Sequence, residues 1–420
     1  MSSSLAIAFV MHGWPPQEYG GVGLYVEALA KQLHQQGHSI TIFVPNHNGQ
    51  NTEESFPWGM LHSISFPKAR NWKETWFRTK RDVVKNITET HFDILHVHHL
   101  GHWPLTLPLY ISSKRTYITL HDYAIICIRG QLYEPQKGIC SGPSAEKCSS
   151  CVREQLFYTP KSSQFTSIVD RFPKVKSKIK KILRKIPLRS QNKTAVQERL
   201  DIAKKTLDSA DGLISPSHDL IRRYQTFTKT HIRHQSLPLL SPLHETPLPK
   251  LPYRFIFASS VIATKGVHLV LNAIRQLPDA QLWVAGSTFP VDGWPMFEKE
   301  ILSTIQDVPN ALYLGNIPHH SVFEHLAQSH CLVLPSLWPE NSPIIIREAL
   351  AMGLEVICSF EGGSRELSPL VHTIPNDSPD ELVRIMQTVM NTPKRNRAPN
   401  FPSMKKHAHE MYTIYSSSKF

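Results

Sequence analysis

Long hydrophobic segments are missing from this chain, and cysteines are few. No apolar run in its 420 residues approaches the roughly 18 residues that a membrane-spanning helix needs, so the sequence predicts no such helix. The start, MSSSLAIAFVMHGW, lacks the basic region and cleavage site of a signal peptide, and we interpret it as leading into a first strand. Six cysteines without an export signal argue against disulfides and for reduced thiols or a metal.

Acidic residues are also the minority among the charges. The 34 Asp and Glu face 46 Lys and Arg, which gives a formal net charge of +12. This balance favours an anionic partner, whether a phosphate-bearing ligand, a membrane surface or a nucleic acid, without choosing among them. A chain of 420 residues can carry two α/β domains, each with its own core.

The amino-terminal half begins like a doubly wound α/β sheet. Residues 5–11 predict a strand, 22–36 a helix and 39–44 a second strand. The loop before the helix contains Gly20, Gly21 and Gly23, without the full G-x-G-x-x-G spacing of a nicotinamide site. These glycines either let a backbone approach a ligand at the carboxyl end of the strand or form a plain tight turn.

Histidines follow the next two predicted strands. Four of them cluster around the end of a strand at 92–98, and no carboxylate or cysteine stands beside them at metal-ligand spacing. We therefore expect this cluster to line a polar cleft: His96, His98, His99 and His102. Another strand, at 116–120, leads into His121, and strand ends are where open α/β sheets bind ligands.

Four cysteines come directly after this region: Cys127, Cys140, Cys148 and Cys151. The last two form a C-x-x-C pair. Cys127 and Cys140 are thirteen positions apart, and Cys140 and Cys148 are eight positions apart. Four thiolates with one tight pair can hold structural zinc or an iron–sulfur cluster. Free thiols or two disulfides are the alternatives, and we favour the metal.

A basic segment and a proline-rich segment separate the two halves of the chain. Seven of the twelve residues at 174–185 are Lys or Arg, with apolar residues among them at helical spacing. This segment is either a solvated helix face or an amphipathic helix lying on anionic lipid. It lacks the interleaved aromatics that would stack on nucleic-acid bases. Five prolines at 236–252 predict an interdomain linker.

The most informative stretch is 335–367, which contains Glu340 and Glu348 with seven residues between them. Pro343 suits the first position of a helix, and Ser342 can cap that helix. Its first free N–H groups, those of Ile344 and Ile345, favour an anion such as a diphosphate. Glu348, deeper in the helix, can accept from ribose hydroxyls, and Glu340, on the rim, can hold a sugar ring. Alternatively, the same stretch is an ordinary amphipathic helix before a strand, in which the two acidic residues have no function.

The phrase Glu340-x7-Glu348, continued by Gly353 and the pair at 362–363, resembles the signature of retaining nucleotide-sugar glycosyltransferases of group 1 (family 4). The resemblance implies the α/β fold class GT-B, with two Rossmann-like doubly wound domains facing across a cleft. We expect an acceptor-side domain at 1–240 and a donor domain at 253–401. The first would hold the cysteine insertion at 127–151 and the basic helix at 174–185, and would be completed by the terminal helix at 402–420.

The resemblance also implies roles for individual residues. His121 matches the histidine beside the donor sugar, so His121 and Glu340 are the expected catalytic residues. Lys265 matches the lysine of a diphosphate clamp, whose arginine is replaced here by Ser260. The expected donor-binding set is Gly20, Gly21, Gly23, Lys265, Gly286, Ile317, Ser342, Pro343, Ile344, Ile345 and Glu348. A four-cysteine insertion at this place occurs in a subset of the family, and it would shape the acceptor side.

These resemblances imply retaining transfer of a sugar from a UDP- or GDP-sugar to a hydroxyl of a glycan or lipid-linked acceptor. The expected setting is cell-surface polysaccharide synthesis, in the cytoplasm and against the inner face of the membrane. No catalytic metal and no nucleic acid are expected. Two alternatives stay open: another GT-B enzyme, such as a sugar-nucleotide epimerase or a phosphorylase, and a non-catalytic basic protein that binds nucleic acid.

Overall fold

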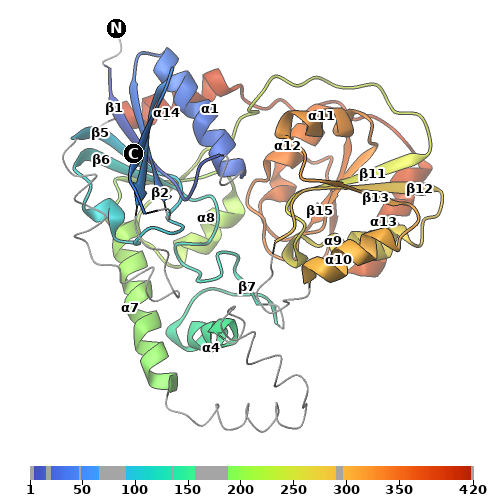
Figure 1. The fold of residues 1–420 in the computed structure, drawn as a ribbon, viewed down its shortest axis with the longest axis horizontal. Helices are drawn as coiled ribbons and strands as arrows, with labels where there is room; N and C mark the ends of the chain where they lie inside the picture. The colour runs from blue at the N-terminus through green and yellow to red at the C-terminus, as the bar shows by residue number, and fades with distance from the viewer. Residues whose placement is uncertain are drawn as a thin grey trace.

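The computed structural model describes residues 4–15, 20–46, 49–65, 91–134, 137–156, 188–289 and 297–417. The side chains of 152–156 and 188–192 are not among the features described. The chain forms two α/β units, each built on its own sheet (Figure 1). The basic segment at 174–185, predicted to be a helix, lies outside the described residues.

The first sheet has eight strands in the order β10-β9-β6-β5-β1-β2-β4-β3. Its neighbours pair in parallel, except for the antiparallel hairpin of β3 and β4 at one edge. The strands are β1 (Ala6–Val10), β2 (Ser39–Asn46), β3 (Thr52–Phe56), β4 (Gly59–Ser65), β5 (Phe92–Val97), β6 (Ser113–Thr119), β9 (Gly212–Ser215) and β10 (Ile232–His234). The central strands are almost wholly buried, which is why the sequence gives them as continuous apolar runs.

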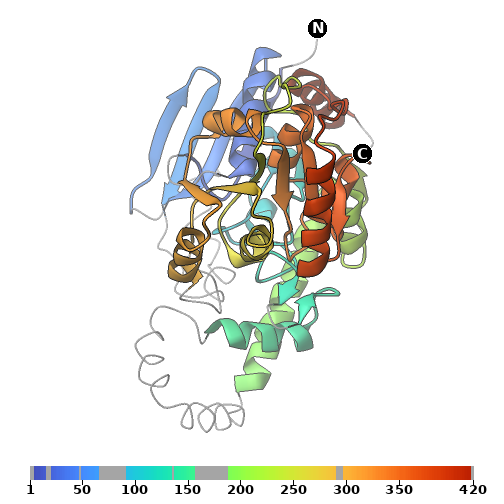
Figure 2. The same ribbon diagram turned by 90° about the vertical axis from the view of Figure 1, so that its right-hand side faces the viewer.

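Helices cover this sheet and bring the end of the chain back to it. They are α1 (Gly21–Gln35), α7 (Leu188–Asp208), α8 (His218–Gln225) and α14 (Met404–Ser416), with a short turn η1 (Leu107–Leu109). Helix α14 packs against α1, although the two helices lie at opposite ends of the sequence (Figures 1 and 2). The Tyr25 hydroxyl and His407 Nε2, 2.8 Å apart, join the two helices in the core.

The second sheet has six parallel strands in the order β13-β12-β11-β14-β15-β16. They are β11 (Tyr253–Ala258), β12 (Ala280–Ala285), β13 (Ala311–Gly315), β14 (Cys331–Leu334), β15 (Glu355–Ser359) and β16 (His372–Ile374). The helices are α9 (Val267–Ile274), α10 (Phe297–Gln306), α11 (His319–Ala327), α12 (Ile344–Ala351) and α13 (Pro379–Asn391), with turns η2 (Ala263–Lys265) and η3 (Ser364–Leu367).

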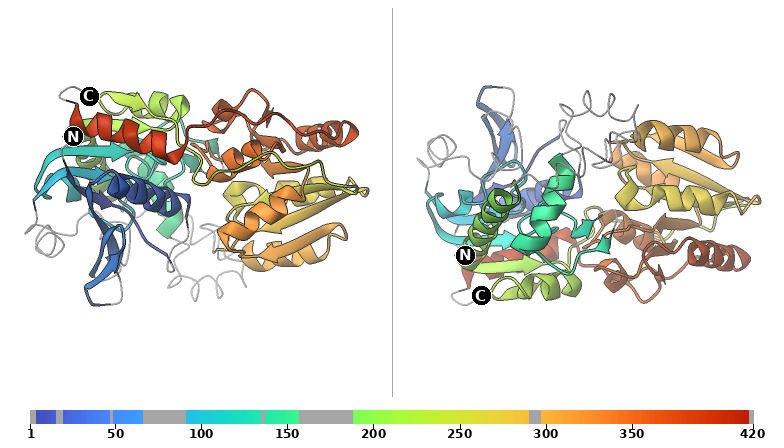
Figure 3. Two further views of the ribbon diagram at one scale, coloured as in Figure 1. Left: turned by 90° about the horizontal axis from the view of Figure 1, so that it is seen from above. Right: turned by 90° about the horizontal axis from the view of Figure 1, so that it is seen from below.

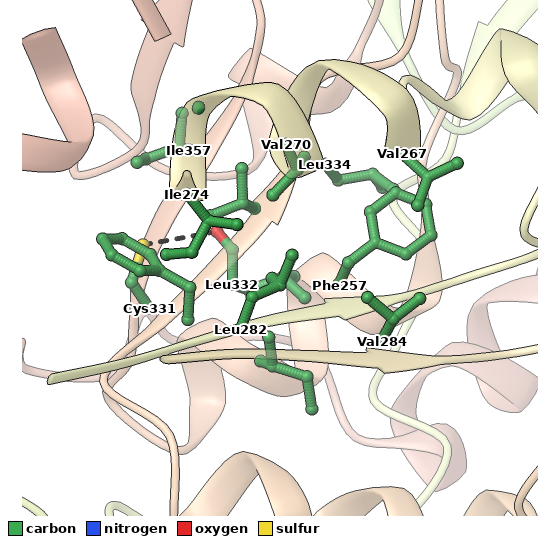
Figure 4. Packing of buried hydrophobic residues seen from close by; sticks show 14 of the residues in the cluster. Phe257, Val267, Val270, Ile274, Leu282, Val284, Cys331, Leu332, Leu334 and Ile357 are labelled. Atoms are coloured by element: carbon green, nitrogen blue, oxygen red, sulfur yellow. Dashed lines mark hydrogen bonds between the residues drawn. The ribbon is translucent and has the colours of Figure 1, made fainter. Parts of the chain in front are cut away.

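The core of the second unit lies between α9 and the sheet (Figure 4). Val270 and Ile274 of α9 are fully buried among side chains of β11, β12 and β14, such as Leu282 and Leu332. Cys331 and Cys358 are small, fully buried residues of the strands. This rigid layer holds the strand ends from which the candidate site is built.

The cysteine insertion forms a small subdomain beside both units. It consists of a hairpin of β7 (Tyr133–Glu134) and β8 (Gly138–Ile139), followed by α4 (Ala145–Leu156). Helix α4 packs on α7, and both lie at the lower side of the molecule in Figure 1 and towards the viewer in the right-hand view of Figure 3. The side chain of Tyr133 packs against the hydrophobic cores of both units.

The predicted fold class is confirmed, because two Rossmann-like parallel sheets form the chain. Most predicted strands agree with the structure within one or two residues, the usual uncertainty of element ends. Among the described residues, no helix is both long and apolar enough to cross a membrane.

Candidate active site

Glu340 lies between β14 and α12, and its carboxylate is already engaged. It accepts a hydrogen bond from Ser336 Oγ at 2.8 Å and forms an ion pair with Lys265. The predicted position on the rim is wrong: Glu340 is only 6% exposed. Its backbone explains this, because Glu340 pairs with Gly362, where a Cβ would lie 2.3 Å from the Glu340 carbonyl oxygen. The lysine predicted to clamp phosphate and the glutamate predicted to hold sugar are therefore direct neighbours.

Helix α12 begins one residue later than the sequence predicts. Pro343 is the N-cap rather than the first helical residue, and the helix has no side-chain cap. The prediction that Ser342 caps it is also wrong, since the Ser342 hydroxyl accepts from the buried Arg347, with Nη2 at 2.8 Å. The positive end of α12, with Ile344 and Ile345 as its first residues, is thus left without a protein side chain to cap it.

The glycine loop of the first unit meets the start of α12. A Cβ on Gly21, the first residue of α1, would lie 3.1 Å from Ile344 Cδ1. The side chain of Ile344 packs against the core cluster under α1. The two helices therefore begin next to each other. Gly20 faces open space, whereas Gly23 packs near Met11 inside its own unit.

Glu348, in the second turn of α12, is buried with one carboxylate oxygen unused. It is 2% exposed, and its Oε1 lies 2.8 Å from His319 Nε2 at the start of α11. This hydrogen bond raises the pKa of His319 above its ordinary value, against the opposing effect of burial. Among the described residues Glu348 Oε2 has no hydrogen-bond partner. A buried carboxylate oxygen without a partner destabilises the fold, so a hydrogen-bond donor from a ligand would stabilise this position.

Two other predicted donor-binding residues lie close to their own unit's backbone. Gly286 has φ near +140°, and a Cβ there would lie 1.9 Å from the Ser259 carbonyl oxygen, so strand packing alone requires glycine. Ile317, just before α11, packs partly against the second core. Neither position needs a ligand to explain its residue type, although both follow strands of the second sheet, Gly286 after β12 and Ile317 after β13.

His121 follows β6 and contacts the loop before α12 through its backbone. Its Nε2 is 3.2 Å from His98 Nδ1, and burial lowers the pKa of His121 to about 3. The imidazole is therefore neutral at any physiological pH. Asn341, between the two glutamates, donates from Nδ2 to the carbonyl oxygens of His121 at 3.0 Å and Leu120 at 3.1 Å.

The prediction that the neighbouring histidines line a polar cleft is wrong for His96 and His98. Both are fully buried, and burial holds the pKa of each well below its usual value. His96 lies between the Tyr415 hydroxyl, at 2.6 Å, and Thr119 Oγ1, at 2.7 Å. The cause is the return of α14, whose Tyr415 covers this part of the sheet. His99 is partly exposed and pairs with Asp122 at 2.9 Å.

Further polar contacts join the units around the N-terminus of α8. Glu366 of η3 accepts from the backbone N–H groups of His218 and Asp219, each at 2.7 Å. Arg223 Nη2 donates to Glu361 at 2.8 Å, and the Ser217 hydroxyl donates to Asn341. Neither Asn341 nor Glu366 was predicted as a site residue from the sequence. The only signal there is that each is a polar residue within or just after the glutamate motif.

The four cysteines of the insertion are free thiols in one neighbourhood. Burial raises the pKa of Cys148 to about 11, with smaller contributions from Cys127, Cys140 and Cys151. Arg129 Nε lies 2.9 Å from Cys151 Sγ. Within the described ranges, no group of three or more His, Cys, Asp or Glu side chains is arranged to hold a metal ion. Structural zinc or an iron–sulfur cluster at these cysteines stays a prediction from their spacing, which metal analysis of the purified chain would test.

Comparison with protein families gives matches on both units. Residues 244–400 match the family described as "Glycosyl transferases group 1", and residues 19–137 match "Glycosyltransferase Family 4". A curated relative is TuaC of Bacillus subtilis (strain 168), named for glycosyl transfer in teichuronic acid biosynthesis. It is 28% identical over 176 residues, which are 41% of this chain and 39% of TuaC. The chain thus aligns with about two fifths of the length of this relative.

Solved structures match nearly the whole chain. Sucrose-phosphate synthase from Thermosynechococcus elongatus has a TM-score of 0.62 at 15% identity, covering 98% of this chain and 94% of its own. HepE of Anabaena, solved in complex with UDP-glucose, has a TM-score of 0.56 at 12% identity, covering 98% and 95%. At such identities the likeness concerns the fold. The chain therefore has the two-domain GT-B fold, and two of its segments, 244–400 and 19–137, are similar to glycosyltransferase families.

Proposed function

We propose that this chain moves a sugar from a nucleotide diphosphate donor to a hydroxyl of an acceptor, with retention of the anomeric configuration. One observation carries the proposal: the N-termini of α1 and α12 lie side by side, with Gly21 against Ile344. Lys265 forms an ion pair with Glu340, which precedes α12 in the chain. Each helix N-terminus is equivalent to roughly half a positive charge. Two such ends beside an ammonium group suit a diphosphate far better than a neutral ligand.

Each part of the donor then has a partner. The diphosphate lies at the uncapped start of α12, where Lys265 can reach it, since an ammonium has three donors and Glu340 takes only part of them. The ribose is bound by the unused Oε2 of Glu348. The sugar lies between Glu340 and His121, which come from different units.

In the transfer step, the bond between the anomeric carbon and the diphosphate oxygen breaks and a bond to the acceptor oxygen forms. The transition state resembles an oxocarbenium ion, as in glycoside cleavage. The acceptor hydroxyl must lose a proton. His121, with a pKa of about 3, is too weak a base at neutral pH, whereas a phosphate oxygen with a pKa near ~6 is better matched. The departing diphosphate therefore takes the proton, on the face from which it leaves.

A UDP- or GDP-sugar is the proposed donor, and a glycan or lipid-linked glycan is the proposed acceptor. Support for the donor comes from the group 1 family match and from HepE, which was solved with UDP-glucose. Support for cell-surface polysaccharide synthesis comes from the resemblance to TuaC. The basic segment at 174–185 would serve binding to the inner face of the membrane, because Lys and Arg are attracted to anionic lipid.

A panel of nucleotide sugars tests the proposal. Thermal unfolding of the chain is followed with UDP-, GDP- and ADP-sugars, since a ligand that binds only the folded state raises the melting temperature. We expect one nucleotide class to stabilise the chain. The sugar of that donor should be released slowly to water and quickly to an acceptor. The proposal fails if no member of the panel stabilises the chain or is consumed.

A further inference from the structure

We propose that His319 is a positioning residue that orients Glu348 for the ribose, so that the site selects nucleotides carrying ribose hydroxyls over their deoxy forms. This inference rests on the proposed function, because it concerns the same donor site. No sequence pattern pointed to His319. It is identified by its contact with Glu348, from the start of α11 to the second turn of α12.

The contact divides the two oxygens of one buried carboxylate. His319 Nε2 lies 2.8 Å from Oε1, while among the described residues Oε2 has no partner. A free carboxylate could rotate and exchange its oxygens. With Oε1 held by the imidazole, rotation would break a charge-assisted hydrogen bond, so Oε2 keeps one direction. The unused acceptor is thereby presented to a ligand in a fixed orientation.

The imidazole is itself held in place by its surroundings. His319 is the first residue of α11, directly after Pro318, whose ring fixes its own backbone angle. Its ring meets Phe323, one turn later, edge to face with 5.0 Å between the centroids. About a third of the side chain stays exposed, so Phe323 and Glu348 hold the ring without closing it off from solvent.

The chemical class that this pair selects is a ribonucleotide. A ribose hydroxyl donates a hydrogen bond to Oε2 and satisfies an oxygen that has no partner among the described residues. A deoxynucleotide leaves that oxygen unpaired, and sites built around such a hydrogen bond reject the analogue that lacks it. The uncapped helix start acts on the phosphates, which both nucleotides share, so it does not discriminate between them.

The test compares ribonucleotides with deoxynucleotides in matched variants. Dissociation constants for UDP, GDP and ADP, and for their 2′-deoxy and 2′,3′-dideoxy forms, are measured by calorimetry with the full-length chain. We expect His319→Ala to weaken binding of the best ribonucleotide about tenfold, the scale of a charged hydrogen bond. Binding of its dideoxy form should change less than twofold. His319→Gln, which can still donate to Glu348, should recover most of the loss.

The neighbouring His320 is the control, because it is exposed on the same turn of α11. His320→Ala should leave all affinities unchanged. An equal loss for ribose and dideoxy forms in His319→Ala would show a merely structural role and overturn the inference, as would no loss at all. If no nucleotide binds the wild-type chain, the proposed function itself is wrong. If nucleotides bind without preference for ribose, only the role of His319 and Glu348 is wrong.

Discussion

At the scale of single residues, the ion pair of Lys265 and Glu340 is the main electrostatic feature of the site. Both side chains are mostly buried, and Ser336 supplies a further hydrogen bond to the carboxylate. A buried pair of this kind adds little net stability, but removing one partner leaves an uncompensated charge. Lys265 therefore has one purpose shown by its contacts, which is to neutralise Glu340 in the folded chain, and one that we propose, which is to offer its remaining donors to phosphate.

Variants at these two positions separate the two purposes. We expect Lys265→Met to lower the free energy of unfolding by about 3 kcal/mol, because Glu340 then stays buried without its cation. Adding Glu340→Gln should restore most of that stability without restoring transfer activity. Urea unfolding and a transfer assay measure both quantities. Equal stability of the single and double variants would contradict the pairing argument.

At the scale of elements, Asn341 joins the start of α12 to the end of β6. Its amide donates to the backbone carbonyls of Leu120 and His121 and accepts from Ser217, so the loop before α12 is tied to the strand end that carries His121. This contact helps to fix the separation of the two catalytic candidates, His121 and Glu340.

Replacing Asn341 should therefore harm turnover more than binding. We expect Asn341→Asp, which keeps the size but cannot donate, to lower kcat about tenfold, because two backbone hydrogen bonds across the units are lost. The dissociation constant of the donor should change less than twofold. Steady-state kinetics and calorimetry give the two numbers. A loss confined to donor affinity would place Asn341 in the nucleotide site instead.

Elements were predictable from the sequence because their signals are local, whereas side-chain partners were not. The helix at α12 and its neighbouring strand follow from a proline, a glycine stop and an apolar run. The use of Ser342 by Arg347 could not be foreseen, since Arg347 is buried beside Ser236, over a hundred positions away. His96 is likewise buried by Tyr415, from the opposite end of the chain. Of the predicted site residues, Gly21 meets Ile344 and Lys265 pairs with Glu340, but Glu340, Ser342, His96 and His98 were given wrong surroundings.

At the scale of the whole molecule, the first unit contains a group of buried neutral histidines, and polar contacts join it to the second unit. Burial keeps the pKa of His96 and His98 well below the ordinary value of 6.5, that of His121 at about 3 and that of His407 at about 4. All four lie in the first unit, near the helix α14 that closes the chain onto it.

These histidines predict a loss of stability on mild acidification. Below pH 6.5 these histidines bind protons in the unfolded chain but stay neutral in the folded chain. The free energy of unfolding therefore falls as the pH falls towards 4. The slope approaches ~1.4 kcal/mol per pH unit for each fully shifted histidine. Urea unfolding between pH 7.5 and 4.5 measures it, and His407→Gln should flatten the curve. A stability that stays constant from pH 6.5 to 5 would show that these rings are not buried as neutral groups.

The most direct measurement is a crystal structure of the chain with the nucleotide diphosphate that binds best. We predict that the diphosphate lies against the backbone N–H groups of Ile344 and Ile345, within reach of Lys265 Nζ and facing Gly21. The ribose should donate to Glu348 Oε2. A nucleotide bound anywhere other than the start of α12 would contradict the proposed donor site, and with it the proposed transfer.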